Sequence, residues 1–207
     1  SWFWEMSQIS VGIVNYSCGN SFSLRAVLIK LNFKVIISDE ISQLNDCDLI
    51  ILPGVGAFPN AVNDLKRKGL FNFLIEHAYK DKPLIGICLG MQLLSDVSSE
   101  FGHTQGLKII PGKVTQLGKN SWHIGWNKIN NEKKDKLFQN YEDCFFFFNH
   151  SYIFDTPEKY KICKTSYKIK FPSVVRNKKT IGFQFHPEKS QAPGESILKK
   201  TIINLIQ

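Results

Sequence analysis

The chain has 207 residues, of which 43% are hydrophobic and 13% aromatic, so it is long enough to bury one core of ordinary size. Its 26 basic and 18 acidic side chains give a net charge of +8. The lysines are scattered in short runs and form no basic stripe with stacking aromatics, which argues against a nucleic-acid partner. No apolar run reaches the roughly 20 residues that span a bilayer, and no signal peptide is visible. We therefore expect one domain with neither a nucleic-acid nor a membrane partner.

The cysteines indicate the cellular compartment and exclude two kinds of site. There are five, they are widely spaced, and none forms a Cys-x-x-Cys pair, so the sequence predicts neither a disulfide framework nor a metal site. We expect a reducing, cytoplasmic setting. Met6 is one of only two methionines, so we interpret residues 1–5 as a remnant or an N-terminal extension and place the domain at residues 6–207.

The first half of the chain alternates short β-branched runs with amphipathic helical patterns. The expected strands cover residues 9–16, 34–37, 48–52 and 84–87, and the expected helices cover residues 22–32, 60–68, 70–81 and 89–96. Such alternation predicts an α/β fold in which a central, mostly parallel sheet is flanked by helices.

The second half has a different pattern. Strands dominate between Leu107 and Phe185, including residues 145–148 and 181–185, and a last helix is expected near residues 195–206. We expect these strands to extend the central sheet in a mixed or antiparallel way. No repeat or linker separates the halves, so we expect a single domain with one core.

Cys88 has an unusual setting, in the stretch "LIGICLGMQ" at residues 84–92. It lies between Gly86 and Gly90, where a buried strand passes directly into a helix. A sharp strand-to-helix turn strains the backbone and needs neighbours without a β-carbon. At such a turn the thiol lies at the positive end of a helix, and the N–H of Leu89 faces the place where an oxyanion would form. The pattern favours a nucleophile over a buried structural cysteine.

A nucleophilic thiol needs a base, and "FQFHPEKS" at residues 183–190 supplies a histidine and a carboxylate in a fixed order. Glu188 is close enough in sequence to orient the imidazole of His186 and stabilise its cation. The remaining candidates are weaker. We interpret His77, in a helical pattern, and His103, in a polar loop, as solvated surface residues.

Several segments together resemble the class I, triad-type glutamine amidotransferases, and among them the glutaminase subunits of imidazole glycerol phosphate synthases. The likeness extends over nearly the whole chain from Ile9. The matching segments are "LPGVGAF" at 52–58, "GICLGMQ" at 86–92, "GLKIIPG" at 106–112, "HIGWN" at 123–127, "NHSY" at 149–152 and "QFHPEKS" at 184–190. The resemblance implies the class I glutamine amidotransferase fold and a glutaminase activity with no cofactor and no metal.

The resemblance also implies roles for individual residues. Cys88, His186 and Glu188 would form the catalytic triad. The oxyanion hole would use Val55 and Leu89, with Gly54 in the same strand. The residues implied to bind L-glutamine are Gly54, Gln92, His150, Ser151 and Tyr152. Trp126 would face a synthase partner, expected to be a cyclase with a (β/α)₈ barrel that forms a heterodimer with this chain and receives its ammonia.

Two departures from the family pattern leave the ammonia acceptor open. The first strand ends in "NYSCGN" at 15–20, where a pattern like Asp-Tyr-Gly-x-Gly-Asn is usual, and Trp122 stands where proline is common. One alternative is therefore a paralogue that supplies ammonia for acetamidino-sugar formation in surface polysaccharides. Two others are a cysteine hydrolase acting alone and a catalytically silent scaffold that binds a partner.

Overall fold

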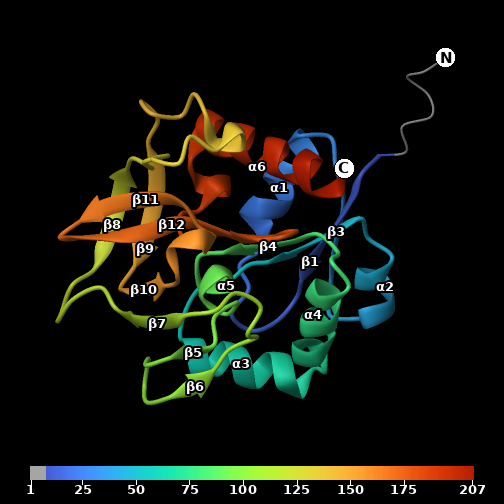
Figure 1. Ribbon diagram of the computed structural model, residues 1–207. Helices are drawn as coiled ribbons and strands as arrows, with labels where there is room; N and C mark the ends of the chain where they lie inside the picture. Colours follow the sequence, from blue (N-terminus) through green and yellow to red (C-terminus); the bar gives the residue numbers. More distant parts are fainter. Residues whose placement is uncertain (1–7) are drawn as a thin grey trace.

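The computed structural model describes residues 8–207, and the expected remnant or extension at residues 1–5 lies outside the described residues. A seven-stranded sheet forms its centre, with the strand order β11-β12-β13-β4-β3-β1-β2 (Figure 1). Five strands, β13, β4, β3, β1 and β2, are parallel to one another. Strand β12 is antiparallel to β13, and β11 is antiparallel to β12. The bounds are β1 Ser10–Val14, β2 Lys34–Ser38, β3 Leu49–Leu52, β4 Leu84–Ile87, β11 Lys161–Tyr167, β12 Ile169–Asn177 and β13 Thr180–Phe183.

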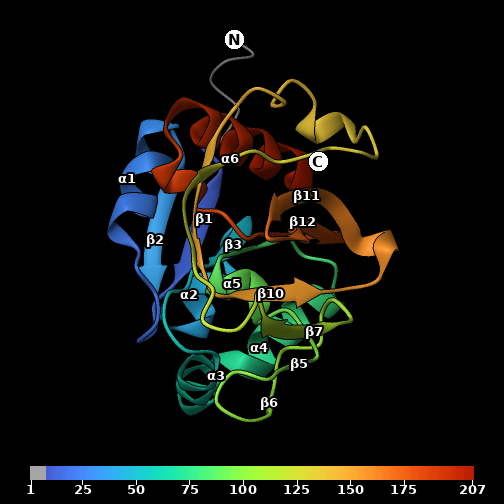
Figure 2. The ribbon, with the colours of Figure 1, turned by 90° about the vertical axis from the view of Figure 1, so that its left-hand side faces the viewer.

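Helices cover both faces of this sheet, because successive side chains of a strand point to opposite faces. Leu49 and Ile51 of β3 pack in one cluster with α1 (Phe22–Lys30) and α6 (Gln191–Ile206). Ile50 and Leu52 pack in the other with α2 (Ile41–Asn45), α3 (Phe58–Arg67) and α4 (Leu70–Tyr79). The views show α1 and α6 on one side and α3 and α4 on the other (Figures 1 and 2). The predicted α/β class is confirmed.

Part of the second half does not extend the central sheet. Strands β11 and β12 do extend it, as predicted, but two smaller sheets form separately. One has the order β10-β7-β5-β6, with β5 Val97–Ser98, β6 Thr104–Gln105, β7 Lys113–Gln116 and β10 Tyr152–Asp155. The other pairs β8 (His123–Asn127) with β9 (Phe146–His150). Within these sheets the strands pair with one another, and β9 makes an additional isolated bridge between Phe147 and His186.

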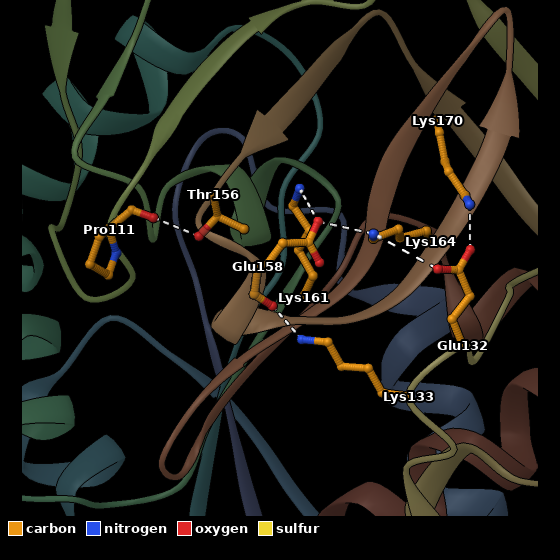
Figure 3. Close-up of polar contacts among 8 residues, drawn as sticks. All are labelled: Pro111, Glu132, Lys133, Thr156, Glu158, Lys161, Lys164 and Lys170. Carbon is orange, nitrogen blue, oxygen red and sulfur yellow. Dashed lines mark hydrogen bonds and ion pairs between the residues drawn. The ribbon is translucent and has the colours of Figure 1, made fainter.

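Exposed ion pairs and hydrogen bonds connect the segment after β8 to the hairpin of β11 and β12 (Figure 3). Glu158, in the 3₁₀ turn η3 (Glu158–Tyr160), accepts from Lys161 and Lys164 at 3.0 Å each. Glu132 pairs with Lys170, and Lys133 donates to the backbone carbonyl of Glu158. Exposed pairs of this kind contribute little individually. Their combined role is to hold the segment beyond β8 against the hairpin.

Two local expectations were wrong. The helix after Cys88, α5, covers only Leu89–Gln92 and not residues 89–96, because the carbonyls of Leu93 and Leu94 accept bonds from the backbone of residues 107–110 and do not continue the helix. His77 is buried and not solvated. Its Nε2–H donates to the carbonyl of Pro83 over 2.8 Å, and burial lowers its pKa. Within residues 8–207, no helix is both long enough and apolar enough to cross a bilayer.

Candidate active site

Cys88 occupies the strained turn that its glycine neighbours predict. Its backbone has φ 54° and ψ −112°, a conformation that residues with a side chain rarely adopt. A β-carbon on Gly86 would lie 2.6 Å from the carbonyl oxygen of Gly90, and one on Gly90 would lie 1.9 Å from that of Leu52. Both glycines are therefore required by close backbone approach. The turn leaves the Cys88 thiol at the carboxyl end of β4, 6% exposed.

His186 and Glu188 come together beyond the end of β13, where the 3₁₀ turn η4 (Pro187–Lys189) begins. Nδ1–H of His186 donates to Oε1 of Glu188 over 2.8 Å, and both side chains are nearly buried. The histidine backbone is held as well. Its N–H donates to the carbonyl of Phe147 over 2.9 Å, and its carbonyl accepts from the hydroxyl of Ser190 over 2.6 Å. Glu188 thus fixes the orientation of the ring, and the two backbone hydrogen bonds fix the position of the main chain.

The charge state of His186 follows from its neighbours. Burial by itself lowers the pKa of the imidazole, but the charge of a Cys88 thiolate, a hydrogen bond to that thiolate and the Glu188 carboxylate together raise the pKa to about 10. Opposite charges at close range in a buried site favour the ionised forms. A cysteine thiolate beside an imidazolium is a nucleophile next to a proton donor.

The segment at residues 53–56, which follows β3 directly, lies beside this pair and contains the residues expected to form the oxyanion hole. The N–H of Leu89 donates to the carbonyl of Gly54 over 3.3 Å, while the N–H of Val55 points away and donates to the carbonyl of Cys18 over 2.7 Å. The hydroxyl of Tyr16 donates to the carbonyl of Pro53 over 2.5 Å. Both expected oxyanion donors are therefore occupied by backbone carbonyls.

A cavity of about 740 Å³ opens over Cys88. Of the residues predicted to bind glutamine, Gln92, His150, Ser151 and Tyr152 line it together with both expected oxyanion residues. Gly54 does not line it. Gly54 lies behind the cavity, in the segment after β3, where a β-carbon would meet the hydroxyl of Tyr16 at 2.7 Å. The structure thus brings most of the predicted residues around one nucleophile.

Gln92 and His150 both donate hydrogen bonds to the same backbone carbonyl in the wall of this cavity. Nε2 of Gln92 donates to the carbonyl of Tyr152 over 3.1 Å, and Nδ1–H of His150 donates to the same carbonyl over 2.8 Å. The Nε2 atom of His150 then accepts from Nδ1–H of His123 over 2.9 Å. Burial lowers the pKa of His150 to about 4, so both imidazoles are neutral and their tautomers are set by this chain of bonds.

Several neighbours of the thiol were missed by sequence reasoning. Gln184 donates to the Cys88 sulfur over 3.8 Å, and the same sulfur lies 3.7 Å from the carbonyl oxygen of Asn149. Glu100 lines the cavity, and burial raises its pKa. Gln184 and Asn149 lie inside segments that match the family pattern, so their position there was an available signal. Nothing local in the sequence distinguishes Glu100 from a surface acid.

Trp126 lies outside the cavity, on the exposed face of β8. It is 48% exposed, and its ring packs edge-on against Phe147 of β9 at 5.8 Å between centroids. Ile124 on the same strand and Trp122, just before it, are exposed as well, so β8 and the residue that precedes it present a row of large apolar side chains. Among residues 8–207 no cluster of three or more potential metal ligands occurs.

Comparison with known proteins gives consistent results. The family model described as "Glutamine amidotransferase class-I" matches residues 6–205. A relative from Carboxydothermus hydrogenoformans, named imidazole glycerol phosphate synthase subunit HisH, is 43% identical over 90% of this chain and 96% of its own length. One of the same name from Listeria monocytogenes is 40% identical, over 90% and 92%. A crystal structure of a glutamine amidotransferase from Thermotoga maritima has a TM-score of 0.72 at 17% identity, over 97% and 99% of the two chains.

Proposed function

Because the chain belongs to the class I glutamine amidotransferase family, and is thus a glutamine amidotransferase, we propose that it is the glutaminase subunit of an imidazole glycerol phosphate synthase in histidine biosynthesis. The observation that carries the proposal is the strained Cys88 beside the buried His186–Glu188 pair in one cavity. The names of relatives at 36–43% identity support the pathway. All five cysteines have free thiols, which agrees with the cytoplasmic setting that we propose.

The proposed reaction uses the triad in two half-reactions. The Cys88 thiolate attacks the side-chain amide carbon of glutamine, and the carbonyl electron pair moves to oxygen. His186 gives its proton to the amide nitrogen, the C–N bond breaks, and ammonia leaves a glutamyl thioester. His186 then takes a proton from water, which attacks the thioester and releases glutamate and the thiol. Glu188 keeps the imidazole oriented and stabilises its cation.

The cavity offers partners for the polar end of the substrate. Glu100 is the half-buried carboxylate of the wall, and we assign it to the α-ammonium group of glutamine, since opposite charges attract strongly where water is partly excluded. Ser151 and the backbone held by Gln92 and His150 complete that wall.

We propose that a partner controls the oxyanion hole. If the peptide between Gly54 and Val55 turns over, the carbonyl of Gly54 leaves the N–H of Leu89, and the N–H of Val55 moves from Cys18 toward the hole. Gly56, with φ 102°, follows this peptide directly and has no β-carbon, so its backbone can adjust when the peptide rotates. The two bonds that break are the ones that hold the closed state. A docked and loaded partner would favour the open state.

The proposed partner is a cyclase subunit with a (β/α)₈ barrel, forming a heterodimer and receiving ammonia directly. Free ammonia is mostly protonated at neutral pH and would be lost to solvent. The exposed apolar row on β8, which includes Trp126, is the surface that we assign to this partner. Exposed apolar patches next to a site are typical of protein interfaces.

Complementation tests the pathway. A histidine auxotroph that lacks its glutaminase subunit should grow when it expresses this chain and should not grow with Cys88→Ala, which loses only the nucleophilic sulfur. Both proteins should bind the cyclase equally. Failure of the wild-type chain to support growth, with Cys88 still labelled by a glutamine analogue, would instead favour the acetamidino-sugar pathway. Failure of that labelling as well would refute the glutaminase assignment.

A further inference from the structure

The amide of Gln184 contacts the nucleophilic sulfur in a way that the triad does not use. Nε2 of Gln184 donates to Sγ of Cys88 over 3.8 Å, and Gln184 is fully buried. Phe183 pairs with Ile87 in the β13–β4 ladder, and the N–H of Cys88 donates to the carbonyl of Phe183 over 2.7 Å. Gln184 and Cys88 are the next residues along these two strands, so the register of the sheet brings them side by side.

A backbone carbonyl determines which end of the Gln184 amide faces the sulfur. The carbonyl of Tyr152 can only accept, so the end of the Gln92 amide that contacts it over 3.1 Å must be the NH₂ group. The same NH₂ group lies 3.2 Å from the side chain of Gln184, which must therefore present its oxygen there. The NH₂ group of Gln184 is left facing Cys88.

An N–H donor beside a sulfur atom distinguishes its two protonation states. The donor gives a charge-assisted hydrogen bond to a thiolate but only a weak one to a neutral thiol. The carbonyl oxygen of Asn149, 3.7 Å from the same sulfur, acts in the opposite direction because it can only accept. Since Gln184 is shielded from water, solvent screens its interaction with the charged sulfur only weakly.

Three titratable groups face this sulfur or act through a neighbour that does. His186 hydrogen-bonds to the thiolate, and Glu188 acts through His186. Burial, the charge of Cys18 and then the charge of the Cys88 thiolate raise the pKa of Tyr16, which keeps that phenol neutral. Among the described residues, the thiolate therefore has two stabilising neighbours, which are the charged imidazole and the neutral amide of Gln184.

We propose that Gln184 is a further catalytic residue that stabilises the Cys88 thiolate through its Nε2–H donor, and that Gln92 is a positioning residue that holds the Gln184 amide in the required orientation. The inference rests on the proposed function and extends it to the charge of the nucleophile. The thiolate attacks glutamine, and negative charge returns to the sulfur when water has attacked the thioester and the C–S bond breaks. The same donor therefore serves both half-reactions.

The test measures the thiolate of Cys88 in the full-length chain, without glutamine. A thiolate absorbs in the far ultraviolet where a thiol does not, and subtracting the pH titration of Cys88→Ala removes the signal of the other cysteines. Gln184→Met keeps the length of the side chain but removes the donor. It should raise the proton affinity of the sulfur about 10-fold, which moves the midpoint of the absorbance change up by about one pH unit. Gln92→Met leaves the Gln184 amide free to turn and should raise the proton affinity about threefold.

A double variant and a buried control separate the donor from general effects of packing. If Gln92 acts only through Gln184, then Gln92→Met should have no further effect in the Gln184→Met background. Ser173→Ala is the matched control. Ser173 lies on the neighbouring strand β12, and its buried hydroxyl has no hydrogen-bond partner among the described residues. Its carbonyl, which accepts from the N–H of Gln184 over 2.9 Å, is kept. This variant should leave the midpoint unchanged.

Two outcomes would overturn the inference and leave the glutaminase assignment intact, provided that a glutamine analogue still labels Cys88 in the wild-type chain. One is an unchanged midpoint in a folded Gln184→Met chain. The other is an equal shift in Ser173→Ala, which would mean that packing alone sets the midpoint. If Gln184→Met does not fold, an unchanged midpoint in Gln92→Met overturns the inference in the same way. Failure of the labelling itself would instead refute the proposed function and the inference with it.

Discussion

Replacing Glu188 by glutamine should lower the pKa of His186 while leaving the shape of the site unchanged. The substitution keeps an oxygen that can accept from Nδ1–H of His186 but removes the negative charge that lies 2.8 Å away. Both side chains are nearly buried, so solvent screens the lost interaction only weakly. The effect is therefore expected mainly in the proton affinity of the imidazole.

The size of this effect can be worked out from the contact. A hydrogen bond to a charged group contributes about 1.5–3 kcal/mol, roughly twice that of a neutral one, so losing the charge costs about 1–2 kcal/mol. Since one pKa unit corresponds to about 1.4 kcal/mol, the pKa of His186 should fall from about 10 by about one unit. Removing the thiolate in Cys88→Ala should lower it further, because that charge is the largest cause that raises it.

The assay is an NMR titration of the imidazole Cε1–H resonances, with His186 assigned from its absence in His186→Gln. The sequence has only five histidines, so assignment by elimination is practical. In the double variant Cys88→Ala/Glu188→Gln, burial is the main remaining influence, so the pKa of His186 should fall below its ordinary value of 6.5. A midpoint that stays in place in Glu188→Gln, or remains above 6.5 in the double variant, would refute this account of the triad.

Three further predictions concern the gate, the turn and the buried imidazoles. Turning the Gly54–Val55 peptide breaks two hydrogen bonds of about 0.5–1.5 kcal/mol each, so the isolated chain should hydrolyse glutamine about 10- to 100-fold more slowly than the loaded complex, and equal rates would rule out the gate. Gly90→Ala places a β-carbon 1.9 Å from the Leu52 carbonyl oxygen and should prevent folding as judged by circular dichroism; a native-like melt would contradict it. His150 has a pKa lowered from 6.5 to about 4, so its contribution to the free energy of unfolding is complete above pH 6.5 and about 3 kcal/mol is lost as the pH falls to 4; His150→Phe should remove that loss, whereas His103→Phe, at an exposed site, should not.

Much of the fold was predictable from local pattern. Alternating β-branched runs and amphipathic segments identify the parallel strands and their helices, because burial on a sheet face demands that periodicity. The turn at Cys88 was equally readable, since only glycine fits where the carbonyls of Leu52 and Gly90 approach so closely. His186 and Glu188 are two residues apart, so their contact needs little from the rest of the molecule.

Other features depended on contacts between distant segments. The sequence around His77 is the same whether the ring faces solvent or the carbonyl of Pro83, and packing of α4 made the choice. The helix after Cys88 stops early because residues 107–110 take its carbonyls. The pairing of β8 with β9 and of β7 with β10 joins segments that are far apart in the chain, in sheets separate from the central one.

At the active site, too, local features could be predicted from the sequence, whereas features that depend on distant segments could not. Sequence alone predicted the thiol, the imidazole and the carboxylate as a triad, because reactivity requires those residue types in particular local settings. The orientation of the Gly54–Val55 peptide, the link from Gln184 to the Cys88 sulfur and the place of Glu100 in the cavity were decided only by the tertiary structure. Each of these depends on a hydrogen bond or an approach between segments that are far apart in the chain, and peptide orientation leaves no trace in the identity of a side chain.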